Sequence, residues 1–318
     1  MDPSGETMKI VVVGSSNTDM IVKTSKIPKP GETVIGGTFS MAAGGKGANQ
    51  AVAAARAGGE VVFIARVGDD LFGRQALEGF REDGIRSDHI VRDRKAASGV
   101  ALIFVDAKGE NSIAVASGAN AALSPADVRN AKAVIASADI LLMQLETPIE
   151  TVETAAEIAS KHGVRVVLNP APARPLGGTL LKRISVLTPN ESEAELLTGI
   201  RIRNDKDAAR AAEALLKKGV ELVLITLGAK GAYVNGSEFQ GVIRSFRVKA
   251  VDTTAAGDVF NGALAVALAE KQPLCEAVRF ANAAAALSVT KLGAQPSAPR
   301  RKEIEALLTH SAGNFFVL

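Results

Sequence analysis

Residues 140–168 read ILLMQLETPIETVETAAEIASKHGVRVVL, with an apolar run at each end and a helical pattern from Ile149 to Lys161 between them. The same alternation extends over much of the chain. Continuous apolar strands separated by amphipathic helices are typical of a parallel sheet covered on both faces, so we expect an α/β core. Further strands are expected at Lys9–Val13, Val61–Ile64, Val186–Leu187 and Leu222–Ile225, and further helices near Glu191–Leu197, Asp205–Lys218, Gly257–Glu270 and Leu274–Lys291.

Some early segments have a different pattern, because they are short and bounded by Gly, Pro, Asn or Asp. Such segments are typical of antiparallel strands. Core elements separate these segments in the sequence, so the chain has to leave the core several times and the segments have to pair with one another in space. We therefore expect one domain over residues 1–318 that carries a small β lid. The expected lid strands are 17–23, 33–41, 99–105 and 111–117.

The composition excludes several classes of protein. Of 318 residues, 47% are hydrophobic and 22% charged, as in an ordinary soluble enzyme. The formal charge is only +3 and Lys and Arg are scattered, which argues against a nucleic-acid or membrane surface. The single Cys275 and the separated histidines offer neither a disulfide framework nor zinc-ligand spacing. With no apolar run long enough for a signal or a membrane span, we expect a cytoplasmic protein.

A carboxylate stands at the expected start of a helix in Val251-Asp252-Thr253-Thr254-Ala255-Ala256-Gly257-Asp258. The small residues before it let the backbone approach a ligand, and the free N–H groups and dipole of a helix start can receive phosphate oxygens. Asp258 could then take a proton from a hydroxyl, and an ordinary pKa of about 3.9 would keep it ionised. An ordinary helix cap is the alternative interpretation.

A glycine-rich run, Gly44-Gly45-Lys46-Gly47-Ala48-Asn49-Gln50, precedes a helical pattern at Ala51–Ala57. Its lack of side-chain bulk lets the backbone, Lys46 and Asn49 approach a polar ligand. The run is not a Walker A loop, which needs Gly-x-x-x-x-Gly-Lys followed by Ser or Thr. A flexible turn into the helix is the alternative.

Polar residues also follow expected strands, at the edge where open α/β sheets bind ligands. Asn17 and Asp19 follow the first strand, which lacks the Gly-x-Gly-x-x-Gly of a dinucleotide site. They could pair with sugar hydroxyls, although an Asx turn is the competing explanation. Glu146 is a further acidic candidate, directly after the run at 140–145.

Two further segments could serve a nucleotide. Asn190 and Glu193 stand three residues apart at a helix start, where they could order water around magnesium or simply cap the helix. Residues 226–231, Thr-Leu-Gly-Ala-Lys-Gly, could lie along a nucleotide or form a plain hairpin.

Taken together, these segments resemble the ribokinase branch of the carbohydrate kinase (PfkB) family, from about Lys9 to Leu308. The runs at 44–51 and 252–258 are similar to the two motifs of the family. Asn169-Pro170-Ala171-Pro172-Ala173 and Thr188-Pro189-Asn190-Glu191 are similar to internal stretches of its ribokinase branch. The resemblance implies a ribokinase-like three-layer α/β/α core with a mostly parallel sheet, and a β lid that supplies a homodimer contact. It also implies ATP as phosphate donor, magnesium as its counter-ion and potassium as a monovalent activator.

The resemblance also implies site residues. The sugar would be held by Asn17, Thr18, Asp19, Gly45, Lys46, Gly47, Ala48, Asn49, Glu146 and Asp258. ATP would be bound by Asn190, Thr226, Leu227, Gly228, Ala229, Lys230, Gly231, Gly257, Asp258 and Asn282. The anion hole would be formed by Ala255, Ala256 and Gly257. Potassium would lie near Asp252, Thr254, Ser288, Lys291, Gly293 and Ser297, and magnesium, through water, near Asn190 and Glu193.

The implied activity is phosphorylation of D-ribose at O5 by ATP, with Asp258 as general base. The alternatives are a kinase of the same family that acts on deoxyribose, fructose or adenosine, and a sensor that binds ribose or nucleotide without transfer. The sequence departs from the family pattern at Ala255, where Gly is frequent, and at Asn282, where His is frequent. Residues 1–7 and the apolar tail at 311–318 fall outside the resemblance, and the tail could pack on the body or a partner, or stay disordered.

Overall fold

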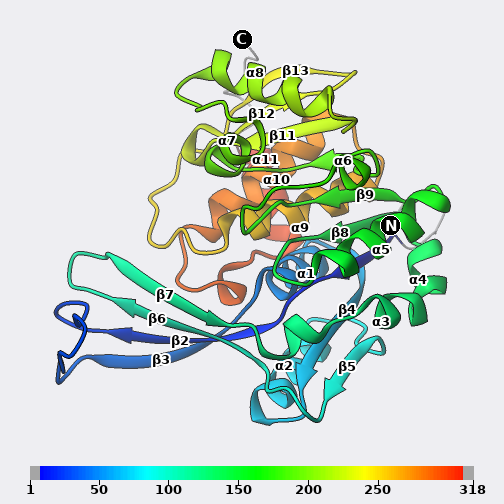
Figure 1. Ribbon diagram of the computed structural model, residues 1–318. Helices are drawn as coiled ribbons and strands as arrows, with labels where there is room; N and C mark the ends of the chain where they lie inside the picture. The colour runs from blue at the N-terminus through cyan, green and yellow to red at the C-terminus, as the bar shows by residue number, and fades with distance from the viewer. Residues whose placement is uncertain (1–7, 311–318) are drawn as a thin grey trace.

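The computed structural model describes residues 8–310, so the apolar tail lies outside the described residues. Within this range a large sheet carries helices on both faces, and a smaller sheet projects from one end (Figure 1). The large sheet has the strand order β13-β12-β11-β10-β9-β8-β1-β4-β5, and its strands pair in parallel except that β12 is antiparallel to both β11 and β13. Its strands are β1 (Lys9–Val13), β4 (Glu60–Gly68), β5 (Ile90–Asp93), β8 (Ile140–Met143), β9 (Arg165–Leu168), β10 (Val186–Leu187), β11 (Leu222–Thr226), β12 (Ala232–Asn235) and β13 (Gln240–Ile243).

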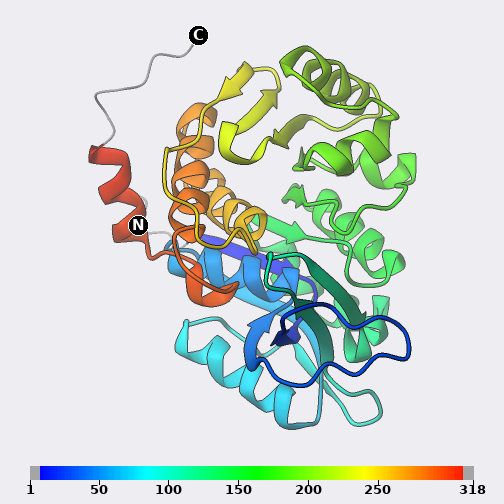
Figure 2. The same ribbon diagram turned by 90° about the vertical axis from the view of Figure 1, so that its left-hand side faces the viewer.

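Helices cover both faces because successive strand residues point to opposite sides. Ile10 and Val12 of β1 belong to one hydrophobic cluster, and Val11 and Val13 belong to the other. The first cluster includes α1, α9 and α10, and the second includes α5, α7 and α8, on opposite sides of the sheet in Figure 2. The helices are α1 (Lys46–Arg56), α2 (Leu71–Glu82), α3 (Pro125–Asn130), α4 (Lys132–Ala136), α5 (Ile149–Lys161), α6 (Gly178–Leu181), α7 (Glu191–Thr198), α8 (Asp205–Leu216), α9 (Ala256–Ala269), α10 (Leu274–Ser288) and α11 (Arg301–His310), with short 3₁₀ turns η1 (Gly118–Ala122), η2 (Gly228–Lys230) and η3 (Gln295–Ser297).

The smaller sheet has the order β3-β2-β6-β7, with strands β2 (Asn17–Lys23), β3 (Thr38–Gly44), β6 (Gly99–Val105) and β7 (Asn111–Ala116). We call it the lid sheet. The strand expected at 33–41 is wrong in its bounds, because β3 begins only at Thr38. Gly36 and Gly37 have φ values of 102° and 105°, outside the extended region that a strand requires.

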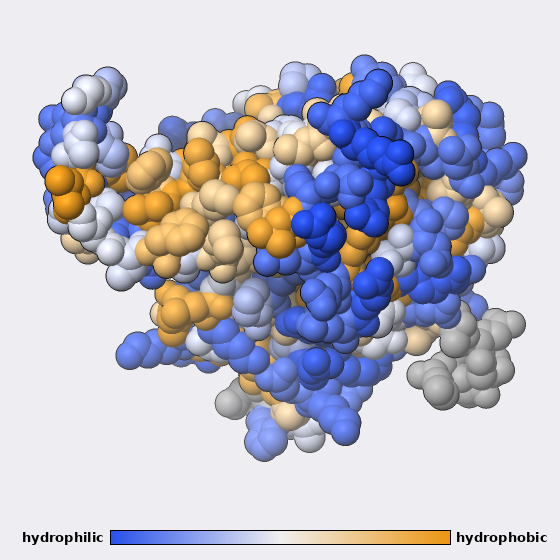
Figure 3. Space-filling view, turned by 90° about the horizontal axis from the view of Figure 1, so that it is seen from below, coloured by the Kyte–Doolittle hydropathy of each residue, from blue (hydrophilic) through white to orange (hydrophobic). Residues whose placement is uncertain are grey.

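Both faces of the lid sheet carry exposed apolar side chains. On the face opposite to Asp19, the side chains of Phe39 and Met41 are 62% and 49% exposed. On the face of Asp19, cross-strand pairing places Ile113 and Val115, which are 54% and 53% exposed. Figure 3 shows apolar residues gathered over this part of the surface. The sequence alone does not reveal this patch, because it assembles only when separate strands pair.

Most of the glycine-rich run, from Lys46 to Gln50, lies inside a helix instead of preceding one. Helix α1 begins at Lys46, five residues before the start expected at Ala51. Its first turn crosses the end of β1 closely: Ala48 N donates to Ser15 O (2.8 Å), and a Cβ on Gly47 would overlap the backbone of Gly14 and Ser15. This tertiary contact outweighs the poor helix propensity of Gly47. Among residues 8–310, no helix is both long and apolar enough to span a membrane.

Candidate active site

Charged side chains from distant parts of the chain face one another beyond the carboxyl ends of the strands. Burial opposes the ionisation of Lys46, the first residue of α1, yet the carboxylates of Asp258, Glu146 and Glu193 raise its pKa. Burial, Glu146 and Asp258 together raise the pKa of Asp19, on β2 of the lid sheet, to about 6. The structure thus brings four predicted carboxylates and a predicted lysine into one cluster.

Asp258 lies in the first turn of α9 and is only 5% exposed. Its Oδ2 accepts a hydrogen bond from Asn49 Nδ2 (2.9 Å), and its Oδ1 accepts one from Gln50 Nε2 (3.0 Å). Burial raises the pKa of Asp258, while Lys46 and these two amides oppose the rise. The ordinary pKa expected from the sequence is therefore wrong, because this carboxylate is shielded from water in a way that the local sequence does not reveal.

The start of α9 presents unpaired backbone donors. Among the described residues, the N–H groups of Gly257 and Asp258 have no acceptor, and no side chain caps the helix. A Cβ on Gly257 would meet no atom within 4 Å, so the space beside it is open. Ala255 precedes the helix in the left-handed conformation, with φ at 58°. That conformation favours glycine, which gives a physical reason why the family often has Gly at this position.

Asn49 provides the clearest sign that a ligand completes the site. Its Nδ2 is used by Asp258, but its Oδ1 is buried and has no hydrogen-bond partner among the described residues. An unsatisfied buried acceptor costs about 1–3 kcal/mol. A hydroxyl group placed beside Asp258 would donate to this oxygen and remove the cost.

Glu146 holds the start of α1. Its Oε2 accepts hydrogen bonds from Ser15 Oγ (2.5 Å) and Lys46 N (3.0 Å), while its Oε1 has no partner among the described residues. The turn before Lys46 is made by Gly45, whose φ is 88° and whose Cβ would overlap the backbone of Ser16 and Asn17.

The predicted sugar-binding residues do not all present side chains to the cluster. Thr18 faces the opposite side of the lid sheet from Asp19, because strand residues alternate, and it lines a cavity of about 280 Å³ against α2. Ala48 is fully buried in the hydrophobic core, and Gly47 packs against the backbone after β1. These three positions are therefore structural or offer only backbone groups.

Asn120 and Ser15 are among the supporting residues that sequence reasoning missed. Asn120 in η1 donates from Nδ2 to Asn17 Oδ1 (2.7 Å) and accepts from Ser16 N (2.9 Å). Asn120 lies 103 residues from Asn17, so no local pattern could reveal it. Ser15, which donates to Glu146, did carry a signal, because it is a polar residue just past the end of an apolar strand.

The predicted nucleotide residues lie around the ends of β10 and β11. Asn190 and Glu193 form a capping box for α7: Glu193 N donates to Asn190 Oδ1 and Asn190 N donates to Glu193 Oε2, both at 2.8 Å. Thr226 pairs with Asn190 as a parallel bridge. The run at 226–231 contains η2 and joins β11 to antiparallel β12, so the structure shows the hairpin, with Gly228, Ala229 and Lys230 exposed and Leu227 buried. Asn282 is buried and donates to Ile243 O (3.1 Å).

Four of the predicted potassium residues, Asp252, Thr254, Lys291 and Gly293, lie on two adjacent loops, whereas Ser288 ends α10 and Ser297 lies in η3. Asp252 joins them, since its Oδ1 accepts from Thr254 N and its Oδ2 accepts from Gly293 N, both at 2.9 Å. Val251 N also donates to Val289 O (2.7 Å). The remaining side chains are engaged elsewhere: Ser288 Oγ donates to Ala285 O, Ser297 Oγ to Ala294 O, and Lys291 Nζ pairs with Glu303. Any ligation by this loop pair would therefore rely on backbone oxygens.

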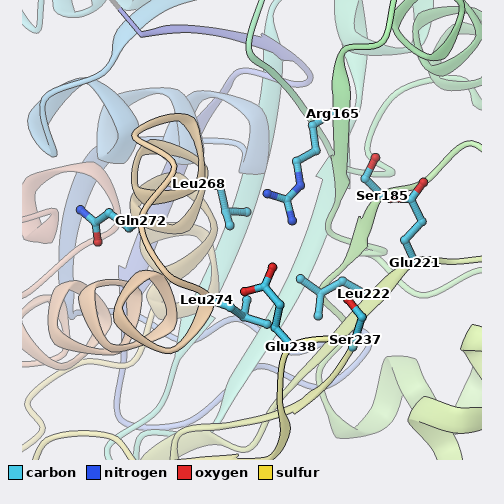
Figure 4. Close-up of a pocket in the computed structure, with 10 residues that line it drawn as sticks. Arg165, Ser185, Glu221, Leu222, Ser237, Glu238, Leu268, Gln272 and Leu274 are labelled. Atoms are coloured by element: carbon cyan, nitrogen blue, oxygen red, sulfur yellow. The ribbon is translucent and has the colours of Figure 1, made fainter. Parts of the chain in front are cut away.

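A separate pocket of about 120 Å³ lies at the opposite edge of the sheet (Figure 4). Arg165 and Leu222, which help line it, stand at the amino ends of β9 and β11. None of the predicted site residues lines this pocket.

The chain matches the family model described as pfkB family carbohydrate kinase over residues 7–301. It is 50% identical over 302 residues to a protein named Ribokinase from Haemophilus influenzae, and the aligned region covers 95% of this chain and 99% of that protein. The solved structure of Arabidopsis thaliana ribokinase complexed with ribose and ATP matches with a TM-score of 0.87 and 36% identity, covering 95% of this chain and 99% of that one. A protein named Deoxyribokinase from Salmonella typhi is 38% identical over 303 residues, with coverage of 95% and 99%. The chain therefore belongs to the pfkB family of carbohydrate kinases and is an ATP-dependent carbohydrate kinase with the α/β fold and second small sheet of the ribokinases.

Proposed function

We propose that this enzyme phosphorylates D-ribose at O5 with ATP and releases D-ribose 5-phosphate in the cytoplasm. The observation that carries the proposal is the buried carboxylate of Asp258 beside the unpaired N–H groups at the start of α9. The likeness to the Haemophilus influenzae protein named Ribokinase supports ribose as the sugar, and the Arabidopsis complex with ribose and ATP supports both substrates.

In the proposed reaction, Asp258 accepts the proton of the 5-hydroxyl as that oxygen attacks the γ-phosphoryl group of ATP. The N–H groups of Gly257 and Asp258 donate to the transferring phosphoryl oxygens, where negative charge develops. The raised pKa of Asp258 suits the role, because a base whose pKa lies closer to the working pH accepts a proton more readily. Lys46 keeps the base ionised and adds positive charge beside the phosphoryl group.

The sugar hydroxyls are proposed to pair with the lid and α1. Asn49 Oδ1 is a buried acceptor without a partner, and Asp19 is a second acceptor within the cluster. Gly44 gives Asp19 its space, since a Cβ on Gly44 would overlap the Asp19 carboxylate. Carboxylate and amide oxygens of this kind accept hydrogen bonds from vicinal diols.

Magnesium is proposed to accompany ATP. The cluster holds more carboxylates than cations, and a triphosphate brings further negative charge, which a divalent cation on the phosphates would offset. Asn190 and Glu193 are occupied as a capping box, so they fit contact through ordered water better than direct ligation. Potassium is proposed to bind the backbone oxygens of the loop pair that Asp252 joins.

A homodimer formed through the lid sheet is a further proposal. Its outer face, the one opposite to Asp19, exposes Phe39 and Met41 on β3 and Leu102 on β6, with Met20 of β2 between Met41 and Leu102. Contiguous exposed apolar surface of this kind is typical of an interaction site.

The test of function compares Asp258→Asn with the unchanged enzyme. We expect the variant to fold and to bind ribose while turnover falls about 10²- to 10⁴-fold, the usual contribution of a general base. Wild-type turnover in this variant would refute the assignment of Asp258 as the general base. Assays of ATP consumption with ribose, deoxyribose, fructose and adenosine, with and without potassium, distinguish the family alternatives. Binding of ribose without any ATP consumption would favour the sensor.

A further inference from the structure

A chain of buried amide and hydroxyl side chains leads from the strand ends to Asp258. Gln50 of α1 is fully buried, and both its polar atoms are used. Its Oε1 accepts from Gln144 Nε2 (2.6 Å), and its Nε2 donates to Asp258 Oδ1 (3.0 Å) and to Asn169 Oδ1 (3.1 Å). Gln144 and Asn169 stand just past the ends of β8 and β9, so the amide of Gln50 is held by the main sheet.

The orientation of this amide is determined by its neighbours. An ionised carboxylate can only accept hydrogen bonds, so Gln50 must turn its NH₂ group towards Asp258. That leaves Gln50 Oε1 buried, and Gln144 is the residue that donates to it. Without this donor, the amide would either keep its orientation and leave Oε1 buried and unpaired, or flip and place that oxygen against the Asp258 carboxylate, and both are costly.

The same chain returns to the anion hole from the other side. Asn169 Nδ2 donates to Thr188 O (3.0 Å), and Thr188 Oγ1 donates to Asn261 Oδ1 (2.6 Å). Asn261 Nδ2 then donates to Gly257 O (2.8 Å), in the first turn of α9. All three side chains are at least nine-tenths buried, so the carboxylate and the helix start that bears it are tied to one polar chain.

We propose that Gln50 is a positioning residue for Asp258, and that Gln144 acts through Gln50 by setting which side of its amide meets the carboxylate. This inference rests on the proposed role of Asp258 as general base. Asn49, which holds the other carboxylate oxygen, also has a buried acceptor without a partner among the described residues, whereas both polar atoms of Gln50 are used within the protein.

The experiment compares Gln50→Met, Gln144→Met and the double variant, since methionine keeps the length of the side chain but loses the amide. Each is assayed for kcat, for KM with ribose, and for the pH dependence of kcat/KM from about pH 5 to about pH 9. We expect Gln50→Met to lower kcat about 10- to 100-fold, as for loss of a hydrogen bond to a charged group. Loss of this hydrogen bond should also raise the pKa of Asp258, so the acid limb of the pH profile of kcat/KM should move up by about one pH unit, with little change in KM.

The double variant tests whether the two residues act in series. If Gln144 acts only through Gln50, the double variant is no slower than Gln50→Met alone. The other charged groups that face Asp258 (Lys46, Glu146, Asp19 and Glu193) are unchanged in these variants, so a moved acid limb reports on the amide.

Thr151→Val is the matched control. Thr151 in α5 is fully buried and donates to Leu123 O (2.7 Å), away from the charged cluster. We expect it to lose stability without moving the acid limb. An unmoved acid limb with wild-type kcat in Gln50→Met, or losses that multiply in the double variant, would overturn the inference. If Gln50→Met does not fold, Gln144→Met carries the same test, because it does not touch Asp258.

The outcomes also separate this inference from the proposed function. Full activity in Asp258→Asn defeats the proposed base itself. An inactive Asp258→Asn beside a wild-type Gln50→Met defeats only the positioning role.

Discussion

Replacing Asp19 by Asn should stabilise the protein while weakening its hold on the sugar. Asp19 is partly buried beside Glu146 and Asp258, and burial and these two carboxylates raise its pKa from 3.8 to about 6. At neutral pH the side chain is nevertheless ionised in both states, but its charge is solvated in the unfolded chain and lies in unfavourable surroundings in the folded protein. Asparagine has nearly the same shape without that charge.

The size of the effect follows from the pKa shift. A shift of about 2 units corresponds to about 3 kcal/mol, because each unit is worth about 1.4 kcal/mol. Since the side chain keeps part of its exposure to water, we expect Asp19→Asn to raise the free energy of unfolding by about 2 kcal/mol at pH 7. The folded protein binds a proton at Asp19 more readily than the unfolded chain, so wild-type stability falls as pH rises through this window. The gain should therefore fade as pH is lowered through 6 and be lost below about 4, where the wild-type carboxyl becomes protonated in both states.

Urea unfolding of both proteins without ligand, at several pH values, measures the gain, and calorimetric titration with ribose measures the loss of affinity. Asp88→Asn is the matched control, because the Asp88 side chain is 71% exposed and its loose pair with Arg86 contributes little. A variant that is no more stable than wild type at pH 7, or a gain that persists unchanged at low pH, would refute the reasoning.

Three further predictions address other parts of the site. Ala255→Gly should raise the free energy of unfolding by about 1 kcal/mol, measured in urea, because glycine adopts the left-handed conformation at φ 58° without strain; a loss of stability would contradict this account. Lys46→Met removes the cation beside Asp258, so the acid limb of kcat/KM should move up by about one unit or more, and an unmoved limb would argue against their coupling. Met41→Glu on the outer lid face should convert a dimer to monomers in sedimentation, whereas Leu71→Glu, exposed on α2, should not; a dimer that survives Met41→Glu would exclude this face as the contact.

The fold could be predicted where side-chain pattern alone decides it. The strands at Ile140–Met143 and Val186–Leu187 have the expected bounds, because each apolar run stops where the chain leaves the covered sheet. Helix α5 likewise has the bounds expected from its periodicity. The predictions were wrong at β3 and at the start of α1, where positive φ values in one case and a close approach to Ser15 in the other override local propensity.

The site could be predicted only in part, for a related reason. Asp258, Lys46 and Asp19 stand in runs whose composition is unusual, and the structure places them in one cluster. Nothing in the sequence indicated that burial would raise the pKa of Asp258, since its shielding comes from distant segments. The role of Asn120 could not be predicted either, because its partner Asn17 lies 103 residues away in the sequence.

Gln144, Asn169 and Thr188 show what signal remains when no motif is present. Each directly follows a buried apolar strand of a parallel sheet. A buried polar side chain there cannot take part in the hydrogen bonds between strands, so it needs a partner near the carboxyl ends of the strands. Neighbouring parallel strands end at the same edge, so such residues meet one another even though they are far apart in sequence. Their partners in turn come from the helices that start or end there, here Gln50 and Asn261. A polar residue just past a buried strand is therefore a candidate for supporting the active site, and the variants of Gln50 and Gln144 test that idea on this chain.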